Sequence, residues 1–216
     1  MAMEIFIRNE RPEDQFTVEN LTREAFWNLH VPGCDEHFLV RKLRDSEDFL
    51  PEFNFVAEAD GRVVGNIMFS RSRVVGQDKQ NLETVTFGPV SVLPEYQRQG
   101  IGRALIERGL KSARASGHRA AIIFGNPAYY ARFGFRPGKD YDIRTSDGEY
   151  AAALQALELF PGALTGVCGR FLESEAFEMD PKEAEEFDKL FPHKEKRVLP
   201  SQAEFIKIAS MVEDAP

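Results

Sequence analysis

The stretch VSVLPEYQRQGIGRALIERGL, residues 90–110, joins three local patterns. An alternating apolar run typical of a β-strand is followed by the turn QRQGIG and then by the apolar spacing of an amphipathic helix. A strand that passes through a glycine-rich turn into a helix points several unpaired backbone N–H groups, and the positive end of the helix dipole, at one place. Gly100 and Gly102 carry no side chain that would keep an anion away from the backbone. The stretch therefore predicts an anion-binding site.

Three interpretations of the two glycines compete. A phosphate-binding P-loop has the pattern GxxxxGK[ST], and its lysine and hydroxyl residue are missing here. A dinucleotide fingerprint has the pattern GxGxxG, whereas Leu105 stands at the position of its third glycine. The third interpretation is an ordinary helix N-terminus with two turn glycines. The turn alone does not separate this last interpretation from an anion site.

The residues before this stretch predict one strand, two helices and then three strands. Asp60-Gly61 is a strong signal for a two-residue hairpin turn between two strands. The strand that leads into the stretch is interrupted by Gly88-Pro89, and since proline cannot donate to a ladder, we expect that strand to bend or splay there. The expected elements in this part are strands over 3–10, 54–59, 62–75 and 83–94, and helices over 11–27 and 35–46.

The residues after the stretch predict a continuation of the same fold. Gly117 is placed to end the helix of residues 100–116. A buried strand over 119–125, a short helix over 127–133 and the start of another strand follow. We expect one or two further strands and a helical turn within 145–177, and a helix that starts at Asp180. With no internal repeat or low-complexity linker, the chain reads as a single α+β (mixed α/β) domain.

Composition and charge exclude several classes of protein. The chain has 216 residues, of which 43% are hydrophobic, enough for one sizeable core. Its net charge of −8 argues against general nucleic-acid binding, yet residues 94–144 hold ten basic and four acidic residues, a local net charge of +6. No apolar run approaches the roughly 20 residues of a membrane span, and the first fifteen residues do not resemble a secretory signal. We therefore expect a cytoplasmic protein with no membrane partner.

Cysteine and histidine usage predicts no metal site. Cys34 and Cys168 are far apart and lack the paired spacing of a zinc site or the density of a disulfide scaffold, so we expect two reduced thiols. The four histidines show no HExxH or other ligand spacing.

The context of the glycine turn resembles a known signature. VSVLPEYQRQGIGRALI is similar to the signature of the GCN5-related N-acetyltransferase (GNAT) family, [RQ]-x-x-G-x-[GA], with Gln97, Gly100 and Gly102 at its fixed positions. Downstream, AYYARFGF resembles the Y-x-x-x-G-F element of the family, with Tyr130 as its tyrosine. The resemblance covers about residues 3–140 and implies the GNAT fold, a central, mostly antiparallel and splayed sheet flanked by helices, here with a C-terminal extension. Residues 1–145 would form the acetyl-CoA-binding core, and residues 146–216 would complete the sheet and the acceptor side of the same domain.

The resemblance also implies acetyl-CoA as the acetyl donor and assigns residues to it. Its pyrophosphate would lie on the backbone amides of residues 98–103, and its pantetheine arm would pair with the splayed strand. The basic segment agrees with this, since coenzyme A carries several phosphates. The residues expected to bind the cofactor are Val90, Val92, Gln97, Arg98, Gln99, Gly100, Ile101, Gly102, Arg103 and Asn126.

The chemistry of acetyl transfer assigns two further side chains. Tyr130 matches the family tyrosine that protonates the thiolate of coenzyme A, whereas Tyr129 beside it would be a packing residue. The N–H of Val92 is placed to polarise the thioester carbonyl. A protonated amine needs a base, and Glu83 is the nearest carboxylate on the strand where some family members carry a glutamate; a solvent-facing role is the alternative for Glu83. Around Asn126 the chain departs from the usual family pattern, because the segment FGNPAYYARFGF is shorter than the usual spacing and contains Pro127.

The predicted function is transfer of the acetyl group of acetyl-CoA to a primary amine, either a small molecule or a protein amino group, by direct attack. One alternative is a non-catalytic acyl-CoA-binding regulatory module, and another is a protein that binds a different nucleotide at the GIG turn. Phe26, Trp27, His30 and Phe38 either line the acceptor pocket or form core, and an aromatic stripe at helical spacing is more often core. The sequence leaves the acceptor and the formation of a homodimer open.

Overall fold

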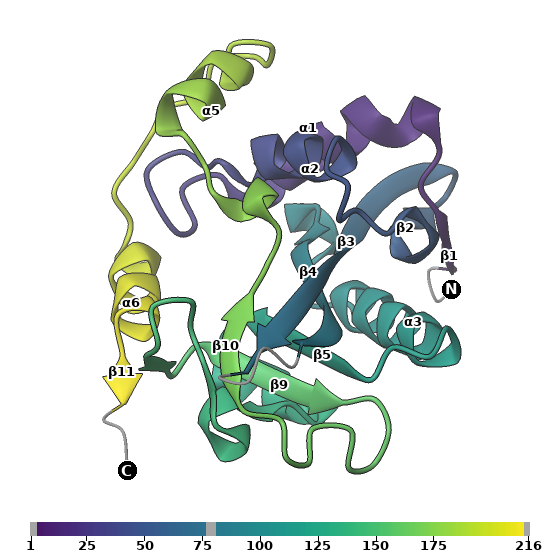
Figure 1. Cartoon of the computed structure of the whole chain (residues 1–216). Helices are drawn as coiled ribbons and strands as arrows, with labels where there is room; N and C mark the ends of the chain where they lie inside the picture. The colour runs from purple at the N-terminus through teal and green to yellow at the C-terminus, as the bar shows by residue number, and fades with distance from the viewer. Residues whose placement is uncertain (1–3, 77–80, 214–216) are drawn as a thin grey trace. The chain divides into compact units, whose positions relative to one another are not determined.

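The computed structural model describes residues 4–76 and 81–213 (Figure 1). The predicted strand that starts at residue 3 and the C-terminal extension that ends at residue 216 each reach beyond the described residues. None of the helices within these two ranges combines the length and apolar character needed to cross a membrane.

The described elements follow one another in largely the order that the sequence predicts. The helices are α1 (Gln15–Phe26), α2 (Glu36–Arg44), α3 (Ile101–Ala115), α4 (Pro127–Tyr130), α5 (Pro181–Asp188) and α6 (Pro200–Ala209). The strands are β1 (Ile5–Asn9), β2 (Phe55–Ala59), β3 (Arg62–Val75), β4 (Asn81–Val92), β5 (Ala120–Phe124), β6 (Arg136–Pro137), β7 (Ile143–Arg144), β8 (Tyr150–Ala151), β9 (Leu154–Glu158), β10 (Gly169–Leu172) and β11 (Val212–Glu213).

Strand pairing confirms a mixed, mostly antiparallel sheet. The strand order is β1-β2-β3-β4-β5-β9-β6, and β10 pairs with both β3 and β7. The pairs β1/β2, β2/β3, β3/β10, β5/β9 and β6/β9 are antiparallel, whereas β4/β5 and β7/β10 are parallel. Helix α3 connects the parallel strands β4 and β5, so β4-α3-β5 is a crossover unit, and the glycine turn lies between its first strand and its helix.

The chain forms two compact units, and β3, β4 and α3 each contribute to both. The first unit holds the described residues up to Phe69, together with Gly88–Gly109 and Glu175–Ala203. The second unit holds the described residues of Ser70–Phe87, Leu110–Ser174 and 204–213.

In the first unit, α1 and α2 lie side by side (Figure 1). Asp60 and Gly61 have φ values of 49° and 75°, and they form the two-residue turn that the sequence predicts between β2 and β3. A buried hydrogen-bond chain ties α1 to two strands, because Ser91 donates to Thr22 (3.1 Å) and Thr22 donates to Asn66 (3.2 Å). This chain fixes the last part of β4, which leads into the glycine turn.

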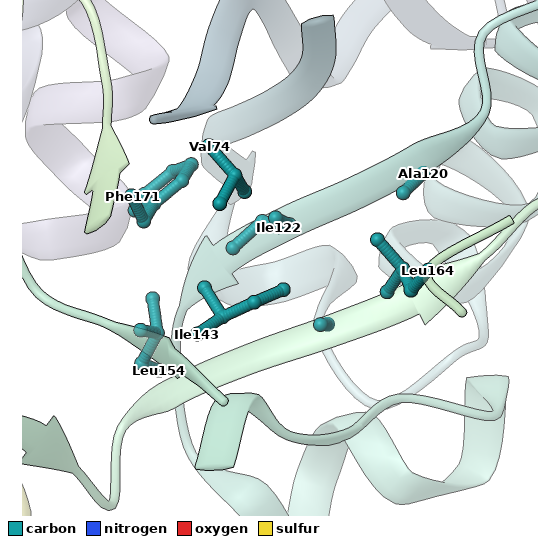
Figure 2. Packing of buried hydrophobic residues seen from close by; sticks show 8 residues of the cluster. Val74, Ala120, Ile122, Ile143, Leu154, Leu164 and Phe171 are labelled. Carbon is teal, nitrogen blue, oxygen red and sulfur yellow. The ribbon is translucent and has the colours of Figure 1, made fainter. Parts of the chain in front are cut away.

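The second unit is built around β5, whose residues Ala120–Ile123 are buried between β4 and β9. Its core is one cluster of apolar side chains contributed by five strands and a loop (Figure 2). The members of the cluster are Val74, Ala120, Ile122, Ile143, Leu154, Ala156, Leu164 and Phe171.

Several elements differ from the sequence prediction. Residues 145–177 contain three strands, whereas one or two were expected, and the short strand β7 ends just before residue 145. The strands β7 and β8 have two residues each, too few to leave an alternating pattern in the sequence. Helix α6 was not predicted, and its apolar residues Phe205 and Ile206 are 41% and 59% exposed, so they do not form a buried stripe.

Candidate active site

The end of β4 loses its neighbour on one side. Strand β4 pairs with β5 only at Val85, which lies opposite Ala121. Residues 88–92 of β4 have no pairing partner on β5. A cis peptide bond joins Gly88 to Pro89 within this strand. Val90 and Val92 are half-buried here, and the side chain of Gln97 donates to the carbonyl of Val92 (3.0 Å). The family glutamine therefore braces the strand end where the sequence predicts contact with the pantetheine arm.

The glycine turn has the backbone conformation that the anion-site prediction requires. Arg98 and Gly100 both have positive φ values, 60° and 86°. The hydrogen bonding of α3 begins with Ala104 N–H donating to the carbonyl of Gly100 (2.9 Å). The amides of residues 101–103 precede this bond and, as in any first helical turn, have no partner within the helix. Residues 97–100 are exposed, so these amides lie beside an open surface.

Close packing holds α3 against the strands of the first unit. A Cβ atom on Gly65 of β3 would lie 2.9 Å from the carbonyl oxygen of Ser91 and 3.3 Å from side-chain atoms of Ile101 and Leu105. Glycine at residue 65 thus lets β3, β4 and the first turns of α3 come together. This packing sets the position of the helix N-terminus.

The two arginines of the turn differ in what they contact. Arg103 pairs with Glu107 on the same helix (2.7 Å), and both side chains are more than half exposed. Within residues 4–76 and 81–213, no side chain forms an ion pair with Arg98, whose own side chain is exposed. An exposed pair of this kind contributes little to stability and leaves Arg103 available to an anion.

Tyr130 lies in the second unit, in an aromatic cluster. Its ring contacts Phe87, Phe135 and Tyr129, with centroid distances of 6.0, 5.6 and 5.0 Å. A Cβ atom on Gly125 would lie 2.2 Å from the Tyr130 ring, so glycine at residue 125 makes room for it. Burial raises the pKa of Tyr130, which keeps its hydroxyl protonated at neutral pH. No described residue forms a hydrogen bond with that hydroxyl, so it is available as a donor.

Asn126 has a structural role at the start of α4. Its side-chain oxygen accepts a hydrogen bond from Ala128 N–H (2.9 Å) and caps the helix, whose first residue is Pro127. The cap explains an asparagine followed by proline at this point. Its side-chain NH₂ group remains exposed for the cofactor contact that the resemblance implies.

The structure gives the two carboxylates of interest very different surroundings. The Glu83 side chain is 66% exposed and lies 4.0 Å from His118. Glu173, which sequence reasoning missed, is mostly buried, and burial raises its pKa to about 7. The signal that was missed lies in GRFLESE. Glu173 comes two residues after Phe171, where the alternation of a half-buried strand would place another apolar side chain.

Residues 175–203 pack against α1 and α2 within the first unit. Arg23, which is 1% exposed, donates to both carboxylate oxygens of Asp188 (2.6 and 3.2 Å). The indole of Trp27 donates to the carbonyl of Glu195 (3.0 Å), and the ring of Phe38 contacts that of Phe187 at 5.3 Å. Trp27 and Phe38 thus make packing contacts within this unit, and both remain half-buried.

Cys34, His37 and Asp188 form a chain that resembles a thiol nucleophile with its base but has the wrong electrostatics. The Cys34 sulfur lies 3.5 Å from His37 Nδ1, and His37 Nε2 lies 3.2 Å from Asp188 Oδ1, although the orientation at Nε2 makes no hydrogen bond. Burial, with neighbouring carboxylates including Glu36, raises the pKa of the Cys34 thiol. Burial lowers the pKa of His37 to about 4. A neutral thiol beside a neutral imidazole is a packing arrangement.

Removing the carboxylate of Asp188 should destabilise the protein. Asp188→Asn leaves the buried Arg23 guanidinium without its counter-charge, so we expect the free energy of unfolding to fall by about 3 kcal/mol, at the low end for a broken buried pair. Urea denaturation measures it. Glu186→Gln on the same helix is the control, because its pair with Lys189 is exposed and should contribute under about 0.5 kcal/mol. Equal effects of the two variants would contradict a buried anchor at Asp188.

The fold and the glycine turn define a GNAT protein, and comparison with known sequences agrees. The family model described as an acetyltransferase (GNAT) domain matches residues 51–137. The uncharacterized N-acetyltransferase YhbS of Escherichia coli strain K12 is 33% identical over 165 residues, which cover 76% of this chain and 93% of YhbS. The N-alpha-acetyltransferase of Sulfurisphaera tokodaii is 30% identical over 160 residues, covering 69% of this chain and 91% of that protein. The chain belongs to the GNAT family.

Two solved structures show the same fold. The crystal structure of Escherichia coli YhbS in complex with CoA has a TM-score of 0.73 and 31% identity, and the match covers 83% of this chain and 94% of that one. A GNAT family acetyltransferase of Brucella melitensis in complex with acetyl-CoA has a TM-score of 0.64 and 33% identity, covering 81% and 98%. The predictions of a GNAT fold, of an acetyl-CoA-dependent acyltransferase and of acetyl-CoA as co-substrate are confirmed. Residues 4–76 and 81–213 contain no group of three metal-ligating side chains that could hold an ion.

Proposed function

We propose that this enzyme transfers the acetyl group of acetyl-CoA to a primary amine by direct attack, and that the glycine turn holds the pyrophosphate of the cofactor. The observation that carries the proposal is the exposed turn at Gly100, which opens the amides of residues 101–103 at the N-terminus of α3. Gln97, Arg98 and Gln99 complete this binding segment, and Arg103 adds a positive charge to it. Backbone amides and a helix N-terminus together favour a phosphate anion.

The strand end and α4 have the other roles that we propose for the cofactor. Val90 and Val92 offer the pantetheine arm the backbone groups that β5 does not pair, with the N–H of Val92 polarising the thioester carbonyl. Asn126 contacts the arm through its free NH₂ group. Tyr130 gives its proton to the departing thiolate, a role supported by a hydroxyl that no described residue engages.

The acceptor is a small-molecule amine or a protein amino group. The relative from Sulfurisphaera tokodaii is an N-alpha-acetyltransferase, which makes a peptide with a free N-terminal amine one arm of the acceptor panel. Residues 1–145 form the cofactor-binding core and residues 146–216 the acceptor side, in a cytoplasmic protein with no nucleic-acid or membrane partner. A homodimer is compatible with this assignment.

A non-catalytic acyl-CoA-binding module is the second candidate. The exposure of Glu83 favours it, because a solvent-facing glutamate is a weak candidate for the base that the sequence assigns to it. Coenzyme A release distinguishes the two functions. An enzyme releases free thiol when acetyl-CoA is mixed with a panel of amines, whereas a binding module retains acetyl-CoA unchanged with every amine.

Acetyl-CoA should raise the melting temperature of the protein, whereas ATP and NAD should not. A ligand that binds only the native state stabilises it by RT ln(1 + [L]/Kd), about 2.7 kcal/mol at 100 times Kd. A thermal-shift assay with each ligand measures this. A larger shift with ATP or NAD would instead place another nucleotide at the glycine turn, and no shift with millimolar acetyl-CoA would contradict the proposed function.

A further inference from the structure

Three polar side chains of the first unit form a buried hydrogen-bond chain that reaches the end of β4. Ser91 of β4 donates to Thr22 of α1 (3.1 Å), and Thr22 donates to Asn66 of β3 (3.2 Å). The exposed fraction of all three residues is 0%. Ser91 stands between Val90 and Val92, the two residues that we assign to the pantetheine arm. The chain therefore acts directly on the strand segment that the proposed chemistry uses.

The pairing of β4 with β3 determines where the backbone of this segment points. Leu93 N–H donates to the carbonyl of Val64 in β3 (2.9 Å). Two residues back along β4, the same antiparallel register places Ser91 opposite Asn66, and their side chains accordingly meet at one hydroxyl of α1. Backbone groups alternate between the two edges of a strand, so the N–H and C=O of Val92 point away from β3. They face the edge that β5 leaves unpaired.

Asn66 completes the chain but leaves one of its own groups unused. Its Oδ1 accepts from Thr22, whereas its Nδ2 is buried and has no hydrogen-bond partner among the described residues. A buried network with an unsatisfied donor contributes no more to stability than apolar side chains of the same shape would. Folding alone therefore does not explain three polar side chains here. Directional bonds do, however, fix the orientation of the strand that they hold.

We propose that Thr22, Asn66 and Ser91 are positioning residues of the acetyl transfer, an inference that rests on the proposed function. Asn66 holds the Thr22 hydroxyl, Thr22 holds Ser91, and Ser91 sets the orientation of the next N–H, that of Val92. A donor to a developing oxyanion must already stand at hydrogen-bond distance from the oxygen, because it then needs no reorganisation during the reaction. The buried chain supplies this fixed orientation.

The Val92 N–H acts while the thioester carbonyl changes its bonding. The nitrogen of the neutral amine forms a C–N bond to the carbonyl carbon, and one C=O electron pair moves onto the oxygen, which accepts the hydrogen bond. The pair then returns to the C=O bond as the C–S bond breaks with its electrons on sulfur. The nitrogen gives up one proton and the thiolate takes up one, so the products are an amide and coenzyme A.

Thr22→Val is the first test, because valine keeps the shape of threonine and removes the hydroxyl that joins the two strands. Loss of an oxyanion donor costs about 10²–10³-fold in kcat, and a donor that is present but misaligned should cost less, so we expect kcat to fall by about tenfold. The Kd of coenzyme A, which has no thioester carbonyl, should change by less than about threefold. Thr22→Ser keeps the hydroxyl and should restore kcat. Thiol release with the amine that the parent acetylates fastest gives kcat, and isothermal titration gives Kd.

Thr84→Val is the matched control near the other end of β4. Thr84 Oγ1 lies 2.8 Å from Ser72 Oγ of β3, and both residues are buried. The variant removes a buried hydroxyl pair between the same two strands, so Thr84→Val and Thr22→Val should lower the melting temperature by similar amounts. Only Thr22→Val should lower kcat. Equal losses of kcat in the two variants would show a general response to weaker packing and would overturn the proposal.

Ser91→Ala cuts the chain on β4 itself and leaves the bond between Thr22 and Asn66 in place. It should also lower kcat, and it carries the test if Thr22→Val does not fold. In the double variant the two losses should not multiply, because both changes break the same connection. A parent-like kcat in Ser91→Ala, or losses that multiply, would overturn the proposal. A parent that binds acetyl-CoA but releases no thiol with any amine overturns the proposed function instead.

Discussion

Gly100→Val should abolish acetyl-CoA binding while the chain stays folded. A valine side chain at this turn would hold the phosphates away from the amides of residues 101–103, and a φ of 86° is unfavourable for any residue with a Cβ atom. Hydrogen bonds to charged groups contribute about 1.5–3 kcal/mol each, so the loss of two corresponds to a Kd at least about a hundredfold higher. Isothermal titration with acetyl-CoA measures it.

Gly117→Val is a matched control for strain. Gly117 follows the other end of α3 with a φ of 87°, and at both glycines an added Cβ would meet no atom within 4 Å. The two valine variants should therefore lose similar amounts of stability, and only Gly100→Val should lose the cofactor. If Gly117→Val weakens acetyl-CoA binding equally, the effect reports damage to the helix and not the loss of an anion site.

Gly102→Val separates steric from conformational effects. Gly102 is the second residue of α3 and has helical backbone, so valine fits its conformation. Weaker acetyl-CoA binding in this variant would come from the side chain alone. Normal binding in both the Gly100 and the Gly102 variant would make the glycines ordinary turn residues.

Local signals were sufficient for the elements that carry the cofactor prediction. Asp60-Gly61, Gly100 and Gly117 all have the positive φ values that their positions in the sequence imply. The strand before the glycine turn and the helix after it have strong period-two and amphipathic patterns, and both form as expected. A short-range pattern is reliable here because backbone conformation at these residues depends on neighbours in sequence.

The rest of the site depends on contacts between distant residues. Glu173 directly follows β10, which pairs with β3 about a hundred residues earlier in the chain, and the surrounding fold covers most of its side chain. Arg23 and Asp188 are 165 residues apart, and each alone reads as an exposed helical residue. Neither a buried carboxyl nor a buried ion pair leaves a local pattern, since both follow from tertiary packing.

Tyr130→Phe should lower turnover and leave cofactor binding intact. The phenyl ring keeps the contacts with Phe87, Tyr129 and Phe135, so the aromatic cluster and the affinity for acetyl-CoA should change little. Only the proton donor is lost, and general acids typically contribute about 10²–10⁴-fold. We therefore expect kcat to fall by at least about tenfold, and by as much as the full contribution of a general acid. The Kd of acetyl-CoA should stay within about threefold of the parent value.

Tyr129→Phe is the matched control, one residue earlier on the same short helix. Its ring contacts Phe133 and lies under the Arg132 guanidinium at 4.6 Å, contacts that phenylalanine preserves, and we assign its hydroxyl no chemical role. Stopped-flow measurement of thiol release isolates the chemical step from product release. An unchanged rate in Tyr130→Phe would remove Tyr130 from the mechanism, whereas a larger loss in Tyr129→Phe would move the proton donor to the neighbouring tyrosine. Because the two variants differ by one hydroxyl on adjacent residues, a difference between their rates reports the proton transfer itself.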